Sequence, residues 1–91
     1  MIKYTNQFKR DYKHEKKSNH HKKLEDDLLS TIKLLAADKQ LPPRRYDHAL
    51  TGNWTDHRNC HIRPDLILIY RKPDANVLEL VRIGSHSKLG L

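Results

Sequence analysis

An unbroken apolar run, Leu66 to Ile69, followed by the aromatic Tyr70, constrains the fold of this chain more than any other segment. A short apolar run bounded by turn residues is typical of a fully buried strand. Arg63, Pro64 and Asp65 precede the run, and their residue types form an adequate turn. The sequence therefore predicts a central strand, and it places His61 and Asp65 at the threshold of that strand.

The N-terminal segment predicts a short strand followed by a surface helix. In "IKYT", Ile2 and Tyr4 alternate with polar residues, which is typical of a strand buried on one side. Asn6 has a residue type that favours a helix N-cap, and Phe8 and Tyr12 then recur at i, i+4 spacing. The run "KKSNHHKK" has no apolar residue, so we expect the helix to end there.

A second, amphipathic helix follows, and the two helices should form a hairpin that lies on a sheet. Its apolar positions at helical spacing are Leu24, Leu28, Ile32, Leu35 and Ala36, with Leu29 widening the stripe. Pro42 and Pro43 forbid a helical continuation. We therefore expect "LPPRRYDHALTGNW" to be a long, partly extended loop, and such loops often carry function.

The second half of the chain predicts three consecutive antiparallel strands. These are "WTDHRNCHI", "LILIYRK" and "VLELVRIG", and "PDAN" suits a hairpin turn between the last two. Beyond them lies only a tail, "SHSKLGL". The order strand, two helices, three strands implies a single α+β domain over residues 1–91, with the helices on one face of the sheet.

Charge and composition narrow the class of partner. Lys and Arg outnumber Asp and Glu by 18 to 11, for a formal net charge of +7, which favours a polyanionic partner. The single cysteine, Cys60, excludes an internal disulfide, and no apolar segment is long enough to span a bilayer. The N-terminus lacks the apolar core of a secretory signal, so we expect a cytoplasmic protein.

The histidines are distributed unevenly. Four of the seven lie near the loop and strand segments: His48, His57, His61 and His86. The other three fall in the helical region and are expected to be solvated: His14, His20 and His21. Because the ordinary pKa of histidine is near neutrality, the first group suits acid or base work.

A basic chain with these histidines suits metal-free cleavage of RNA. The reaction needs a base for the 2′-OH proton, an acid for the departing 5′ oxygen, and cations that offset charge on the phosphorane. Asp65 supplies a carboxylate beside the histidines, and Arg82 ends the last strand. If the three strands are sequential neighbours, these residues converge at one end of the sheet.

Other interpretations of the same residues remain open. His57, Cys60 and His61 have residue types and spacing that suit zinc, although a fourth ligand is not evident and a strand would put Cys60 and His61 on opposite faces. Trp54 is expected to pack in the core or at its rim, or to stack on a base. The basic helix "FKRDYKHEKK" is either a solvated face or a surface that tracks phosphates.

Three motifs in order resemble the YafQ branch of the RelE/ParE superfamily of bacterial toxins. They are H-x-L-x-G-x-W, then H-x-x-P-D before an apolar strand, then R-x-G-x-H near the end. The N-terminal "IKYTNQFKRDYK" is similar to the family's first strand and helix, so the resemblance covers essentially the whole chain. It implies a compact fold like that of microbial ribonucleases.

The resemblance implies an mRNA interferase, a ribosome-dependent endoribonuclease that inhibits translation and needs no cofactor. The catalytic positions it implies are His48, His61, Asp65, Arg82 and His86. RNA contacts are expected from Lys9, Arg10, Trp54, Arg58 and Lys88. It also implies a cognate antitoxin, typically a ribbon-helix-helix dimer that would give a heterotetramer and mediate any contact with operator DNA.

The chain departs from the family's pattern at its end. Members commonly have an aromatic residue shortly after the last histidine, whereas this tail reads Lys88-Leu89-Gly90-Leu91. A leucine can replace packing but not base stacking. Two rival functions fit the same fold: a non-catalytic basic module that binds RNA by charge, and a gyrase poison, although the histidine set argues for cleavage.

Overall fold

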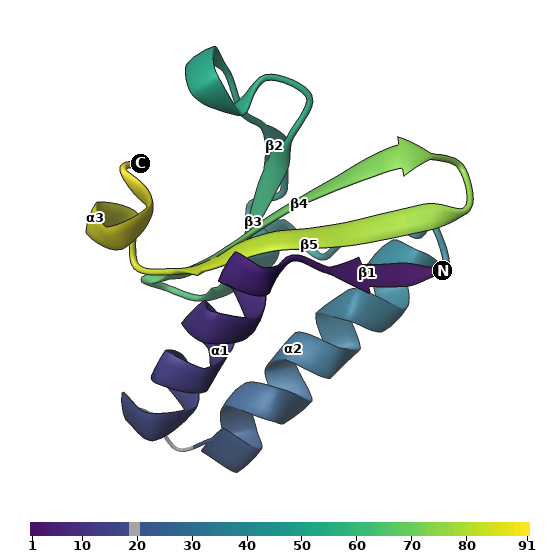
Figure 1. Cartoon of the computed structure of the whole chain (residues 1–91). Coiled ribbons are helices and arrows are strands. Elements are labelled where there is room, and N and C mark those ends of the chain that lie inside the picture. Colours follow the sequence, from purple (N-terminus) through teal and green to yellow (C-terminus); the bar gives the residue numbers. More distant parts are fainter. Residues whose placement is uncertain (19–20) are drawn as a thin grey trace.

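Two helices cover one face of a five-stranded sheet (Figure 1). The computed structural model describes residues 1–18 and 21–91. The elements are β1 (Ile2–Tyr4), α1 (Asn6–Ser18), α2 (His21–Ala36), β2 (His48–Ala49), β3 (Arg58–Arg63), β4 (Leu66–Asp74), β5 (Val77–Gly84) and α3 (His86–Leu89), with 3-10 turns at Pro43–Arg45 and Gly52–Trp54. The predicted α+β fold, with a helical hairpin on one face of the sheet, is confirmed.

The sheet is mixed. Its strand order is β1-β5-β4-β3-β2; β1 runs parallel to β5, and every other neighbouring pair is antiparallel. The three predicted antiparallel strands correspond to β3, β4 and β5. The fourth antiparallel strand, β2, was not predicted, because it forms from only two residues within the long loop.

Strand β4 is central and buried on both faces, as its apolar run predicts. Leu66, Leu68 and Tyr70 belong to the core under the helices, whereas Ile67 and Ile69 belong to a smaller core on the other face. The helices contribute Phe8, Leu24, Leu28, Ile32 and Leu35 to the first core. The second core is completed by Leu50, Trp54, Val81 and Leu89. Each fully buried Leu or Ile side chain stabilises the fold by about 1.5–3 kcal/mol.

The start of α1 differs from the prediction. The hydroxyl of Thr5, not the side chain of Asn6, accepts a hydrogen bond from the Phe8 amide at 2.9 Å, so Thr5 caps the helix. The same hydroxyl donates to the Val81 carbonyl at 2.7 Å. This one residue therefore begins the helix and attaches it to β5.

The helical hairpin is otherwise close to the prediction. Helix α1 ends and α2 begins within the run where a break was expected. Leu29 does not widen the buried stripe, because it is 46% exposed, and Ala36, which was also predicted to be in the stripe, is exposed at the end of α2. The predictions for His20 and for the side chain of His21 lie outside the described residues.

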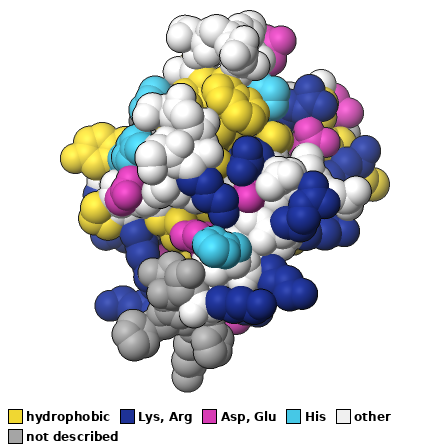
Figure 2. Space-filling model, turned by 60° about the vertical axis from the view of Figure 1, so that its left-hand side comes forward, with side chains coloured by type: hydrophobic (Ala, Val, Ile, Leu, Met, Phe, Trp, Pro, Cys, Tyr) yellow, Lys and Arg dark blue, Asp and Glu magenta, His cyan; other side chains and the backbone are white. Residues whose placement is uncertain are grey.

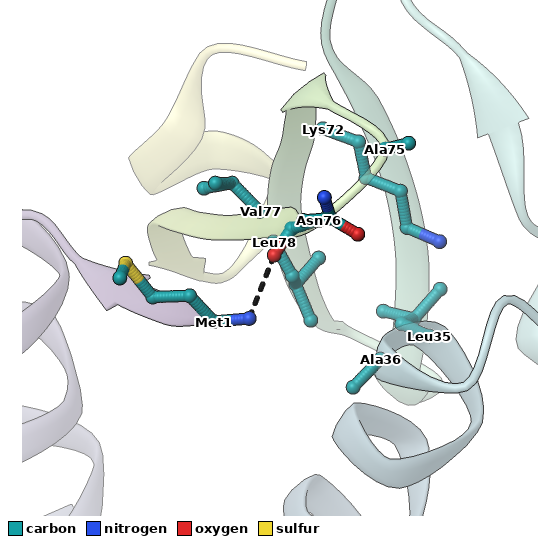
Figure 3. Close-up of a pocket in the computed structure, with 8 residues that line it drawn as sticks. All are labelled: Met1, Leu35, Ala36, Lys72, Ala75, Asn76, Val77 and Leu78. Carbon is teal, nitrogen blue, oxygen red and sulfur yellow. Dashed lines mark hydrogen bonds between the residues drawn. The ribbon is translucent and has the colours of Figure 1, made fainter.

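The prediction that β1 has a buried side is wrong. Ile2 is 36% and Tyr4 46% exposed, because β1 is the edge strand and pairs only with β5. The N-terminal nitrogen of Met1 donates to the Asn76 carbonyl at 2.7 Å and holds the start of β1 against the β4–β5 turn (Figure 3). A pocket of about 190 Å³ opens there, and no histidine lines it.

Two further segments differ from the sequence expectation. Trp54 ends a 3-10 turn rather than beginning a strand, and β3 starts at Arg58. The expected tail folds as α3, whose N-cap Ser85 accepts a hydrogen bond from the Lys88 amide at 3.2 Å. Figure 1 shows α3 turning back beside the end of β5. This turn sets the position of His86.

Candidate active site

The turn between β3 and β4 places His61 and Asp65. His61 pairs with Ile67 in the sheet, and the register then shifts between His61 and Arg63, which indicates a bulge beside the turn. The Arg45 guanidinium donates to the Ile62 carbonyl at 2.6 Å and so fixes the end of β3. A buried central strand on one side and this anchor on the other give the two side chains a rigid base.

His86 is held by Asp65. Its Nδ1 lies 2.6 Å from Asp65 Oδ1, and its backbone amide donates to the same oxygen at 3.2 Å. These bonds lower the pKa of Asp65, so the carboxylate remains ionised at neutral pH. Because Nδ1 is engaged, Nε2 is the ring nitrogen available for exchange of a proton with a substrate.

His61 lies against His86, with 5.3 Å between their ring centroids. Partial burial is the largest cause of a lowered pKa for His61, and the nearby positive charges of His86 and His48 lower it further. His61 is therefore neutral at pH 7. The two imidazoles are thus adjacent but have different surroundings, which is the arrangement that separates a base from an acid.

His48 lies on β2 beside this pair. Its Nδ1 is 2.8 Å from the Tyr46 carbonyl, and β2 pairs His48 with Asn59 of β3. Asn59 and His61 lie on the same face of β3, so His48 and His61 lie on the same face of the sheet, and the charge of His48 contributes to the lowered pKa of His61. The structure therefore brings together four of the five predicted catalytic residues: His48, His61, Asp65 and His86.

Arg82 has a different environment from the histidines. Its guanidinium binds Asp11 through Nε at 2.7 Å and Nη2 at 3.2 Å. Asp11 is only 1% exposed and also accepts from the Ile83 amide at 3.2 Å. Burial alone would raise the pKa of Asp11, but these hydrogen bonds and one from Gln7 lower it below its ordinary value. Arg82 thus joins β5 to α1, whatever role it has toward substrate.

The zinc interpretation is not supported by the arrangement of its residues. Cys60 is fully buried in the core under the helices, whereas His61 lies on the opposite face of β3, as the strand pattern predicts. Burial raises the pKa of the Cys60 thiol to about 12. Within residues 1–18 and 21–91, no group of three or more His, Cys, Asp or Glu side chains is close enough to hold a metal ion.

Comparison with known proteins identifies the family. The family described as "Bacterial toxin of type II toxin-antitoxin system, YafQ" matches residues 1–90. The chain belongs to the YafQ family. The mRNA interferase toxin YafQ of Escherichia coli strain K12 is 37% identical over 90 residues, which cover 97% of this chain and 92% of that protein. The resemblance seen in the sequence is thereby confirmed.

Solved structures agree with this assignment. A copper-bound mutant toxin from Helicobacter pylori has a TM-score of 0.87 and 34% identity, covering 97% of this chain and 96% of that chain. YafQ in the E. coli DinJ–YafQ complex has a TM-score of 0.85 and 32% identity, and the match covers 98% of this chain and 96% of that chain. The YoeB–YefM toxin–antitoxin complex from Staphylococcus aureus, at 21% identity, shows the shared fold alone.

The predicted RNA-contacting residues of this YafQ-family protein are spread around the site rather than gathered in it. Arg58 pairs with Asp47 at 3.2 Å, and Lys88 lies 3.6 Å from Asp11. Trp54 packs in the second core and against His57, so its packing interpretation is the one the structure supports. Lys9 and Arg10 lie on α1, and Figure 2 shows Lys and Arg side chains over much of one face.

Sequence reasoning missed two residues of this neighbourhood. Tyr46 is 64% exposed, and its ring centroid lies 5.1 Å from that of His61. The available signal was an aromatic residue directly before Asp47 and His48 in a loop expected to carry function. Asp11 gave no such signal, because its partner Arg82 is 71 residues away in sequence.

In the described ranges, no helix has both the length and the apolar character needed to span a bilayer.

Proposed function

We propose that this YafQ-family protein is an endoribonuclease that cuts mRNA by metal-independent acid and base catalysis. The observation that carries the proposal is the adjacent pair His61 and His86, of which only His86 is bonded to a carboxylate. The E. coli relative is named an mRNA interferase toxin, which agrees with this chemistry. We further propose that cutting occurs on the ribosome, in the cytoplasm, and inhibits translation.

Each group has a role in the proposed reaction. Neutral His61 takes the proton of the 2′-OH, and the 2′ oxygen attacks phosphorus. His86 gives a proton from Nε2 to the departing 5′ oxygen as the bond from phosphorus to that oxygen breaks. Asp65 orients His86 and stabilises its imidazolium form. The products are a 2′,3′-cyclic phosphate and a 5′-OH.

The remaining predicted residues have supporting roles in this proposal. His48 orients the phosphate or assists proton transfer from β2. Arg82 offsets charge on the phosphorane while it keeps its bond to Asp11. The phosphates and bases of the flanking mRNA contact Lys9, Arg10, Trp54, Arg58 and Lys88.

The proposed partner in the resting state is an antitoxin. One solved structure is described as the E. coli DinJ–YafQ toxin–antitoxin complex, and its matching chain shares the fold of this protein over 98% of this chain. We infer a cognate antitoxin, a ribbon-helix-helix dimer that forms a heterotetramer with two toxin chains. Operator DNA would be reached only through that antitoxin.

The test is primer-extension mapping of a reporter mRNA in a translation extract, with and without ribosomes. It compares the natural chain with His86→Ala and with a control, His14→Ala, which changes a histidine on α1 outside the proposed site. We expect discrete cuts that require ribosomes and His86 but not His14. Intact mRNA in every lane would leave a basic RNA binder or, if replication stops, a gyrase poison.

A further inference from the structure

Tyr46 has an unusual position for a large apolar side chain. It is 64% exposed, yet its backbone is held in the left-handed region at φ 48° and ψ 47°. The Tyr46 amide donates to the Pro43 carbonyl at 3.1 Å, and its own carbonyl bonds His48. A tyrosine rarely adopts this conformation, and such positions cluster at functional sites. The turn thus holds the ring in the solvent beside His61.

The ring of Tyr46 borders both the candidate active site and an open pocket. On one side its centroid is 5.1 Å from that of His61. On the other it lines a pocket of about 720 Å³ together with Pro42, Pro43 and Asp47. This volume is within the range of small-molecule sites. The Tyr46 side chain therefore lies between this pocket and His61 of the candidate active site.

The lining of this pocket suits a nucleobase. Tyr46 and the two prolines offer apolar surface for the face of a planar ring, and an exposed aromatic ring stacks on any base. Asp47 and Arg58 supply an acceptor and donors for the polar edge of the base. They are already fixed, because Asp47 Oδ1 accepts from Arg58 Nε at 3.2 Å and from the Tyr70 hydroxyl at 2.5 Å.

We propose that Tyr46 and the adjoining pocket form a nucleotide subsite, in which the base next to the cleaved phosphate stacks on the Tyr46 ring. This inference rests on the proposed function, because it takes the RNA strand to pass His61. Stacking there would fix the strand so that its 2′-OH meets His61. In this arrangement the base next to the cleaved phosphate stacks on Tyr46 rather than on Trp54, which is partly buried against the second core.

The experiment uses fluorescence of 2-aminopurine, a base analogue whose emission falls when it stacks. The probe is a short RNA with 2-aminopurine beside one 2′-deoxy nucleotide, which lacks the attacking hydroxyl and so is not cut. Protein is added to this RNA in two settings. In the first the RNA is free in solution at low salt, and in the second the same RNA is bound to ribosomes as mRNA. The proteins compared are the natural chain, Tyr46→Phe, Tyr46→Leu and Tyr46→Ala.

We expect quenching with the natural chain and with Tyr46→Phe, and loss of quenching with the other two variants. Loss of one base stack should weaken binding roughly 5- to 150-fold. Tyr4→Ala is the matched control, since Tyr4 is also an exposed tyrosine but lies on the opposite edge strand. That variant should quench and bind like the natural chain.

Several outcomes would overturn the subsite. One is that Tyr46→Leu still quenches the 2-aminopurine. Another is that Tyr4→Ala loses as much quenching as Tyr46→Ala, and the third is that the natural chain quenches neither the free nor the ribosome-bound RNA. A change in the pH dependence of cutting at unchanged RNA affinity would mean that Tyr46 only positions His61.

Cutting of an all-ribose RNA is followed in parallel. If cutting does not depend on Tyr46, the proposed subsite is wrong and the proposed endoribonuclease activity is supported. If quenching depends on Tyr46 but no cutting occurs, the subsite is supported and the proposed endoribonuclease activity is wrong.

Discussion

The two central histidines are chemically different because of what surrounds each ring. Both rings are partly buried, but His86 is hydrogen-bonded to Asp65, whereas His61 is desolvated and faces the positive charges of two other histidines. Both causes favour the neutral form of His61. A base must be neutral to accept a proton, so the environment of His61 suits that role.

The first prediction concerns the titration of His61. Followed by NMR of its ring, His61 should titrate below the ordinary value of about 6.5. Since His86 contributes a like charge, His86→Ala should raise the pKa of His61, whereas His14→Ala should leave it unchanged. Cutting should fall as pH decreases through the pKa of His61, because the base becomes protonated. An unchanged titration in His86→Ala would contradict the electrostatic coupling.

The second prediction concerns Asp65. Asp65→Asn removes the carboxylate that orients His86, so cutting should fall roughly 100-fold or more, within the range of acid–base catalysis. Asp65 is exposed, so the thermal unfolding midpoint should change little. The double variant with His86→Ala should cut no worse than His86→Ala alone. Additive losses would show that Asp65 acts independently of His86.

Residue types and motif order were enough to predict that His61, Asp65 and His86 meet, because they lie at the ends of strands that are sequential neighbours, but they did not predict that Arg82 pairs with Asp11. They were not enough to find Tyr46. Its exposure depends on a left-handed backbone conformation that a tyrosine rarely adopts.

At the scale of elements, α1 is attached to β5 by hydrogen bonds to two residues, Thr5 and Asp11. Thr5 caps the helix and bonds the Val81 carbonyl. One turn and a half later, Asp11 accepts the Ile83 amide. Strand β1 pairs with β5 over residues 78–80, and the pairing ends at Leu80. The helix therefore satisfies backbone groups of β5 beyond the end of β1.

The third prediction tests the cap of α1. Thr5→Ala should lower the free energy of unfolding by roughly 0.5–2 kcal/mol, because the Phe8 amide loses its acceptor. Asn6→Ala, the matched control at the next position, should cost little. Urea unfolding measures both. If Asn6→Ala lowered the free energy of unfolding more than Thr5→Ala, Asn6 would be the N-cap, as the sequence predicted.

The fourth prediction tests the buried carboxylate. Asp11→Ala leaves Arg82 and the Ile83 amide without an acceptor, so we expect a loss of roughly 3–5 kcal/mol in unfolding free energy. Glu79→Ala is the control, since it breaks an ion pair with the more exposed Arg71 and should cost roughly 0–1 kcal/mol. If both variants lost a similar free energy of unfolding, the buried Asp11 contact would stabilise the fold no more than the exposed ion pair does.

Elements with a strong periodic pattern were predictable, and short ones were not. The apolar period of α2 and the run in β4 determine which faces are buried, so their predictions hold except at Leu29 and Ala36, which are exposed. Strand β2 has two residues and α3 has four, too few for a pattern to develop. Strand β1 has the alternation of a half-buried strand, but its place at the sheet edge exposes it.

At the scale of the whole molecule, the net charge of +7 sets how the protein meets RNA. Charge alone cannot distinguish an enzyme from a basic binder, because both lose affinity as salt rises. What can be tested is where the charge acts, because cations that contact the RNA matter more than equal charges elsewhere.

The last prediction therefore compares two double variants of equal net charge. The first variant, Lys9→Ala with Arg10→Ala, removes two cations predicted to contact RNA. The second, Lys33→Ala with Lys39→Ala, removes one lysine in the last turn of α2 and one just after that helix. If each predicted contact is to a phosphate, the first variant should reduce the slope of log affinity against log salt by about 1.4 in total. The second should leave the slope nearly unchanged. Equal slopes in both variants would mean that RNA senses only the total charge, and the predicted path over α1 would be wrong.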